Sequence, residues 1–145
     1  MKQRITILGA TGSIGQSTLS VLALPPERYE LFAVTAHGNV AAMAEICRTY
    51  HPQYAVMANP QAAEQLREHL TGLQITVLAG DENVAAVAAA TEVDTVMAAI
   101  VGAAGLLPTM AAIKAGKRVL LANKEALVMS GQLFMDAVAR YQAEL

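Results

Sequence analysis

Short runs of β-branched and other apolar residues alternate along the chain with longer, alanine-rich stretches. This alternation predicts an α/β fold, in which a doubly wound, mostly parallel sheet carries helices on both faces. The apolar runs predict strands at Arg4–Leu8, Leu31–Thr35, Tyr54–Met57, Ile75–Leu78, Thr95–Ile100 and Arg118–Leu121. Apolar residues at helical spacing predict helices at Ile14–Leu24, Val40–Tyr50, Pro60–Thr71, Glu82–Ala90, Pro108–Ala115 and Gly131–Leu145.

Residues that favour helix ends support these boundaries. Asn39 is placed to cap the helix that begins at Val40, and Asn59 followed by Pro60 is a favourable start for the next helix. We find no internal repeat and no linker. The 145 residues therefore predict one domain, spanning 1–145.

The composition narrows the classes of protein. With 54% hydrophobic and 15% charged residues and a net charge of −2, we expect a compact globular domain without a nucleic-acid partner. The longest apolar run, Val96–Leu107, is too short to cross a membrane of roughly 30 Å as a helix. A strand is predicted within a few residues of Met1, which leaves no room for a signal peptide and favours the cytoplasm. The single cysteine, Cys47, lies in a helical pattern and is expected to pack in the core.

The run GATGSIG at residues 9–15 is placed between the first predicted strand and the first predicted helix. In this position Gly9 can form a tight turn, Gly12 lets a pyrophosphate approach the backbone, and Gly15 permits close packing of helix on sheet. The motif predicts a Rossmann-like dinucleotide-binding domain. The hydroxyls of Thr11 and Ser13 are candidate ligand contacts, although either can serve only as a helix cap.

The end of the second predicted strand bears on the choice of dinucleotide. Domains that select NAD commonly carry Asp or Glu there, which binds the ribose 2′-hydroxyl and repels a 2′-phosphate. This chain instead has Ala36, His37, Gly38 and Asn39, so NADP(H) is favoured. His37 can donate to a 2′-phosphate and Gly38 and Asn39 can add backbone and amide contacts, but His37 can equally be a solvated loop residue.

A second polar cluster follows the last predicted strand. Asn123, Lys124 and Glu125 come directly after it, at the edge of an open α/β sheet where ligands bind. Asn123 can both donate and accept hydrogen bonds, Lys124 can hold an anionic or carbonyl group, and Glu125 can accept from a ribose or a nicotinamide amide. A solvated turn before a helix is the alternative interpretation.

Three segments together carry a family resemblance: GATGSIG at 9–15, AAIVGAAGL at 98–106 and ANKE at 122–125. In this order and spacing they resemble the 1-deoxy-D-xylulose 5-phosphate reductoisomerase family. The resemblance implies an oxidoreductase that uses NADPH and a divalent metal (Mg²⁺, Mn²⁺ or Co²⁺). Such an enzyme rearranges and reduces 1-deoxy-D-xylulose 5-phosphate, a sugar phosphate, to 2-C-methyl-D-erythritol 4-phosphate in non-mevalonate isoprenoid biosynthesis. It also implies a homodimer for the full-length protein.

The resemblance also implies roles for individual residues. NADPH would be contacted by Thr11, Gly12, Ser13, Ile14, His37, Gly38, Asn39, Asn123 and Glu125, and the substrate by Lys124. The family often places a basic residue in the loop after the second strand, where this chain has the residues AHGN. The family's metal-binding Asp-Ser-Glu segment does not occur in the 145 residues, so we assign no metal site and no catalytic residue here and expect the chain alone to be inactive.

Two other functions remain open at the level of sequence. One is the NADP domain of a protein like aspartate-semialdehyde dehydrogenase, which would need a nucleophilic cysteine at a later strand end than Cys47. The other is a non-enzymatic dinucleotide-binding module, which gives no reason for the segment 123–125. An Asp-x-Glu segment downstream of Leu145 would distinguish the three.

Overall fold

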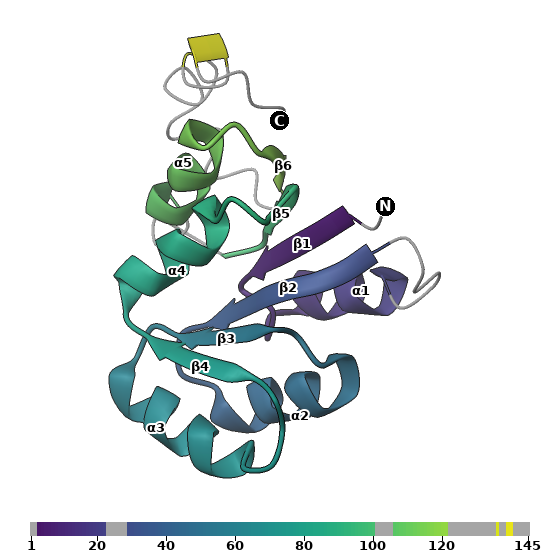
Figure 1. Cartoon of the computed structure of the whole chain (residues 1–145), viewed down its shortest axis with the longest axis vertical. Helices are drawn as coiled ribbons and strands as arrows, with labels where there is room; N and C mark the ends of the chain where they lie inside the picture. Colours follow the sequence, from purple (N-terminus) through teal and green to yellow (C-terminus); the bar gives the residue numbers. More distant parts are fainter. Residues whose placement is uncertain (1–2, 23–28, 101–105, 122–135, 137–138, 141–145) are drawn as a thin grey trace.

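The computed structural model describes residues 3–22, 29–100, 106–121, 136 and 139–140. Its core is a six-stranded parallel sheet in the order β4-β3-β2-β1-β5-β6 (Figure 1). The strands are β1 (Gln3–Leu8), β2 (Tyr29–Ala36), β3 (Tyr54–Met57), β4 (Thr76–Ala79), β5 (Thr95–Ala98) and β6 (Arg118–Leu121). The helices are α1 (Ser13–Leu22), α2 (Val40–Tyr50), α3 (Pro60–His69), α4 (Asp81–Ala89) and α5 (Leu106–Lys114).

Helices cover both faces of the sheet, because each face carries its own cluster of buried apolar residues. On one face α1, α2 and α3 pack against the sheet through side chains such as Leu19, Met43 and Leu66. On the other face α4 and α5 pack through Val87 and Ile113. The predicted doubly wound α/β fold is confirmed.

The predicted elements recur with small shifts at their ends. The predicted strand 95–100 stops at Ala98, because both neighbouring strands end at the same level, with Leu8 and Leu121 as the last paired residues. β2 begins two residues earlier than predicted, since Tyr29 still pairs with Gln3. Most of the predicted helix 131–145 lies outside the described residues. The three residues of it that the structure describes, 136, 139 and 140, are helical.

The order of the strands creates a crevice. The chain builds β1 to β4 outward in one direction and then returns through α4 to place β5 on the other side of β1. In open α/β sheets, ligands bind outside the carboxyl ends of the strands where the order reverses in this way. Here that point lies between β1 and β5.

Among the described residues, no helix combines the length and apolar character needed to span a membrane. Cys47 is fully buried in α2, as expected for a packing residue. Burial raises the pKa of its thiol to about 12.

Candidate dinucleotide-binding site

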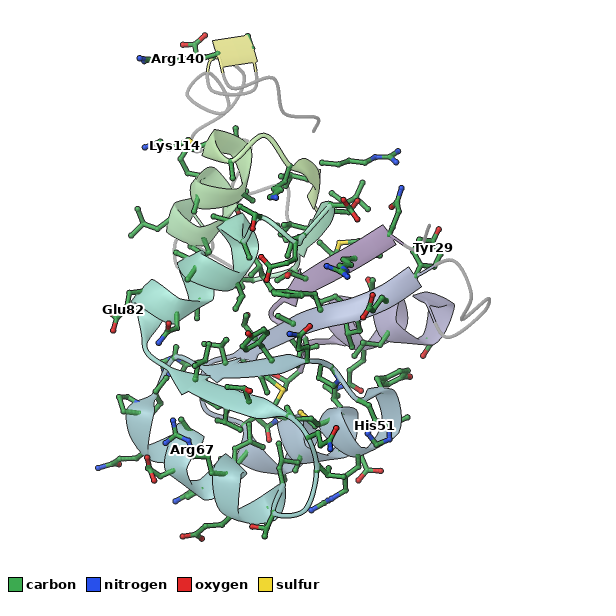
Figure 2. All side chains as sticks on the ribbon, viewed as in Figure 1. Tyr29, His51, Arg67, Glu82, Lys114 and Arg140 are labelled. Atoms are coloured by element: carbon green, nitrogen blue, oxygen red, sulfur yellow. The ribbon has the colours of Figure 1, made fainter. Side chains whose placement is uncertain are left out.

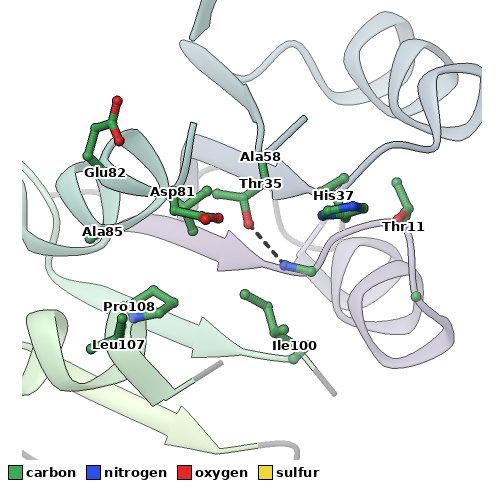
Figure 3. Close-up of a pocket in the computed structure, with 15 residues that line it drawn as sticks. Thr11, Thr35, His37, Ala58, Asp81, Glu82, Ala85, Ile100, Leu107 and Pro108 are labelled. Carbon is green, nitrogen blue, oxygen red and sulfur yellow. Dashed lines mark hydrogen bonds between the residues drawn. The ribbon is translucent and has the colours of Figure 1, made fainter. Parts of the chain in front are cut away.

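A cavity of about 670 Å³ opens at the carboxyl edge of the sheet, at the reversal point between β1 and β5 (Figure 3). Most of its wall is apolar and it receives residues from the ends of β1, β2, β3 and β5 and the starts of α4 and α5. The lining residues are Gly9, Thr11, Gly12, Thr35, Ala36, His37, Ala58, Asp81, Glu82, Val84, Ala85, Ala99, Ile100, Leu107 and Pro108.

The glycine turn after β1 is fixed by close backbone contacts at two of its three glycines. Gly9 has a φ of +77°, and a Cβ there would lie 2.8 Å from the carbonyl oxygen of Ala99. A Cβ at Gly15 would lie 2.5 Å from the carbonyl oxygen of Gly9, because α1 passes directly over the turn. The predicted roles of Gly9 in the turn and of Gly15 in helix packing are confirmed.

Gly12 is different, because packing within the protein does not require it. A Cβ there would meet only the carbonyl oxygen of Gly9, at an ordinary contact distance of 3.6 Å. Gly12 is exposed and lines the cavity. A side chain at this position would therefore occupy space on the cavity side, where a ligand could approach the backbone.

The start of α1 presents backbone donors at the same place. The first N–H groups of a helix have no partner within it and carry partial positive charge. In α1 these belong to the turn that begins at Ser13 and includes Ile14, next to Gly12. Gln16 stabilises the entry to the helix, since its side-chain amide donates to the carbonyl oxygen of Thr11 at 2.9 Å. A phosphate is the ligand chemistry that suits this end of the cavity.

Thr35, the penultimate residue of β2, holds the glycine turn in place. Its hydroxyl accepts a hydrogen bond from the N–H of Gly9 at 3.1 Å, drawn as the dashed line in Figure 3. Its carbonyl oxygen accepts another from the N–H of Ala10 at 2.8 Å. The sequence analysis does not single out Thr35, although a threonine at the end of the otherwise apolar predicted strand Leu31–Thr35 was the available signal.

The loop after β2 places the predicted 2′-phosphate residues at the cavity mouth. His37 is exposed and lines the cavity, and a Cβ at the neighbouring Gly38 would meet nothing within 4 Å. Asn39 caps α2, as predicted, by accepting from the N–H of Ala42 through its side-chain oxygen at 3.2 Å. Its amide nitrogen is the group that can serve a ligand.

The opposite wall was not predicted. Ala58 follows β3, Asp81 and Glu82 begin α4, and Leu107 and Pro108 belong to the first turn of α5. The rule that ligands bind at the carboxyl ends of parallel strands could have found them, since Ala58 and Asp81 come within three residues of a predicted strand end.

Asn123, Lys124 and Glu125 lie outside the described residues. Within the part of the chain that the structure describes, no group of three or more His, Cys, Asp or Glu side chains could hold a metal ion.

Comparisons with known proteins agree on one family. Residues 5–131 match the family described as 1-deoxy-D-xylulose 5-phosphate reductoisomerase. Proteins of that name from Photobacterium profundum and Idiomarina loihiensis are 60% and 58% identical to this chain, over 99% of its length. The chain spans only 36% of the length of each of these relatives.

Solved structures of the same family share the fold. The enzyme from Zymomonas mobilis in complex with NADPH is 41% identical, with a TM-score of 0.94, over 100% of this chain and 38% of that one. A reductoisomerase in complex with NADPH, fosmidomycin and magnesium is 45% identical, with a TM-score of 0.91, over 97% of this chain and 35% of that one.

Proposed function

Because the chain belongs to the 1-deoxy-D-xylulose 5-phosphate reductoisomerase family, we propose that residues 1–145 form the NADPH-binding domain of such an enzyme. The observation that carries the proposal is the open space beside Gly12, at the start of α1 and on the wall of a 670 Å³ cavity. The coenzyme's pyrophosphate fits there, against the helix N-terminus. When bound, NADPH supplies a hydride to the substrate.

The chain's own residues would hold the coenzyme in a defined direction. Thr11, Gly12 and the first turn of α1, with Ser13 and Ile14, bind the pyrophosphate. His37, Gly38 and Asn39 receive the 2′-phosphate of NADPH. No carboxylate stands at the end of β2 to repel that phosphate, so NADPH is preferred to NADH. Asn123 and Glu125 are proposed to contact the coenzyme as well, and Lys124 the substrate, on the strength of the family resemblance.

The test is a calorimetric titration of NADPH and NADH into the chain and into Gly12→Val. We expect tighter binding of NADPH than of NADH by the unaltered chain, and loss of both in the variant, whose thermal unfolding should stay close to that of the parent. Equal affinities for the two coenzymes would contradict the 2′-phosphate assignment. Unchanged binding by a folded Gly12→Val would contradict the whole placement.

The proposal extends to the complete enzyme. It would convert 1-deoxy-D-xylulose 5-phosphate to 2-C-methyl-D-erythritol 4-phosphate as a cytoplasmic homodimer, with the metal and the substrate phosphate held by parts of the protein outside this chain. Solved relatives contain magnesium, and this chain spans 36% of its curated relatives' length. We therefore expect the chain alone to bind NADPH without turnover, which an NADPH-oxidation assay with Mg²⁺ or Mn²⁺ and substrate would check. Turnover proportional to the concentration of the chain would refute this division of roles.

Of the two alternative functions left open by the sequence, one is set aside and the other needs an assay. A domain like that of aspartate-semialdehyde dehydrogenase is set aside by the family match and by the burial of Cys47, whose raised pKa keeps the thiol neutral. A non-enzymatic dinucleotide-binding module would use the same cavity, and the assay on a full-length protein distinguishes it from the enzyme.

A further inference from the structure

The proposed binding mode determines which end of the cavity receives the adenine base. With the pyrophosphate at the start of α1 and the 2′-phosphate at the end of β2, the adenosine half extends toward β3 and β4, away from β5 and β6. Backbone hydrogen bonds hold these strand ends together. The N–H of Ala58 donates to the carbonyl oxygen of Ala36 at 2.9 Å, and the N–H of Gly80 donates to the carbonyl oxygen of Met57 at 3.0 Å. The residues that follow β3 and β4 therefore form the wall that the base meets.

That wall offers apolar surface for a flat ring and one carboxylate directed toward it. Ala58, Val84 and Ala85 supply the apolar surface. Asp81, the first residue of α4, lines the same space. In Figure 3 its carboxylate is directed toward Thr35 and Ala58, on the cavity side of the helix.

The neighbouring acidic residue, Glu82, has a different orientation. Its carboxylate is turned away from the other labelled residues in Figure 3 and lies on the outside of the molecule in Figure 2. One of its oxygens would lie 3.0 Å from a Cβ built on Gly80, so the side chain folds back over the start of the helix. Among the described residues, neither the Arg4–Glu30 nor the Arg67–Glu64 ion pair involves Asp81.

We propose that Asp81 is the residue that selects the base of the coenzyme, by accepting a hydrogen bond from the 6-amino group of adenine. This inference rests on the proposed function and assigns a specificity to the same site. An ionised carboxylate only accepts hydrogen bonds, and the 6-amino group only donates them. A purine with a carbonyl oxygen at position 6 would instead set two acceptors against each other, so the site should discriminate against it.

The probe is the reduced hypoxanthine analogue of NADPH, in which a carbonyl oxygen replaces the 6-amino group. The measured quantity is the ratio of its dissociation constant to that of NADPH, from titrations of the chain followed by nicotinamide fluorescence. A ratio is needed because removing the Asp81 charge strengthens binding of both polyanions, and that common effect cancels. We expect a ratio of roughly ten for the unaltered chain, as for the loss of one charged hydrogen bond.

The decisive variant is Asp81→Asn, which keeps the shape of the side chain and adds a donor. Because an amide can donate to the 6-carbonyl oxygen and accept from the 6-amino group, we expect the ratio to fall to about two or less. Glu68→Gln, a carboxylate-to-amide change at an exposed position of α3 outside the cavity wall, should retain the unaltered ratio.

Each outcome bears on a different claim. A ratio near one in the unaltered chain, or the same ratio in Asp81→Asn as in the parent, would refute base selection by Asp81 while leaving NADPH binding intact. Failure of the unaltered chain to bind NADPH at all would refute the proposed function and this inference with it. The ratio of the unaltered chain does not depend on whether the variant folds.

Discussion

The hydroxyl of Thr35 accepts a hydrogen bond from the backbone N–H of Gly9 at 3.1 Å, although the two residues are 26 positions apart. This contact joins the end of β2 to the turn that follows β1. Thr35 is 1% exposed, so water has little access to replace its hydroxyl. The shape of the glycine turn therefore depends on a side chain from the neighbouring strand.

Replacing that hydroxyl should weaken both folding and binding. In Thr35→Val the side chain keeps its shape, but the N–H of Gly9 loses its acceptor, which costs about 1–3 kcal/mol. We expect a lower free energy of unfolding in urea and weaker NADPH binding, because the turn is no longer held against β2. Thr35→Ser, which retains the hydroxyl, is the control. A stability of Thr35→Val equal to that of the parent would mean that the hydrogen bond contributes nothing net.

Substitution of Gly15 should mainly lower the stability of the fold, whereas substitution of Gly12 should mainly weaken NADPH binding. Gly15→Ala brings a Cβ to 2.5 Å from the carbonyl oxygen of Gly9, a backbone atom that cannot move aside cheaply. We expect a loss of about 1–3 kcal/mol in the free energy of unfolding. Gly12→Ala has 3.6 Å of room and should lose far less stability, while it weakens NADPH binding. Chemical denaturation of the two variants side by side would check this, and equal stability losses would argue against it.

A carboxylate at the end of β2 should reverse the choice of coenzyme. We expect His37→Asp to weaken NADPH binding by about tenfold or more, since the new charge faces the 2′-phosphate. The affinity for NADH, which carries a hydroxyl at that position, should fall only slightly or rise. The control is His51→Asp, at a second exposed histidine (labelled in Figure 2) that follows the last residue of α2 and does not line the cavity, and whose φ of 50° suits aspartate. If both variants weaken NADPH binding equally, the effect comes from the change in net charge and not from a contact with the 2′-phosphate.

Cys47 should be inert in the native protein. Burial raises the pKa of its thiol to about 12, so the reactive thiolate is scarce at pH 8. We expect a disulfide reagent to label it at least ~100-fold more slowly in buffer than in concentrated urea. The same shift makes the folded state lose stability as pH rises above the ordinary thiol value of 9.0, because only the unfolded chain then ionises. Cys47→Ala should lack that part of the alkaline loss.

Sequence periodicity was sufficient for the strands and helices because each buries a distinct face. β3 at Tyr54–Met57 and α2 at Val40–Tyr50 match the prediction, since Asn39 and a short apolar run mark their limits. The strand that was predicted to reach Ile100 ends at Ala98 because its partners end there. Where a strand stops depends on its neighbours, and a local pattern does not contain that information.

The site was predictable where one short motif builds it and not where distant segments meet. The turn at residues 9–15 carries its own chemistry in its glycines. The wall formed by Ala58, Asp81 and Pro108 depends on the strand order, which brings together segments from three separate connections. Thr35 was missed for the same reason, because its partner Gly9 is close only in the folded sheet.

The central place of β1 has a consequence for the way the chain is made. β1 pairs with β2 on one side, but its other neighbour is β5, and the contact of Arg4 with Asp94 spans 90 residues. During synthesis β1 to β4 can assemble with α1, α2 and α3 before that neighbour exists. Until α4 and α5 emerge, the opposite face of this partial sheet, with Leu8, Phe32 and Val56, has no helices to cover it. The growing chain therefore passes through an interval in which an apolar sheet face and one side of β1 are open to other chains, and chaperones that shield nascent polypeptides would act in that interval.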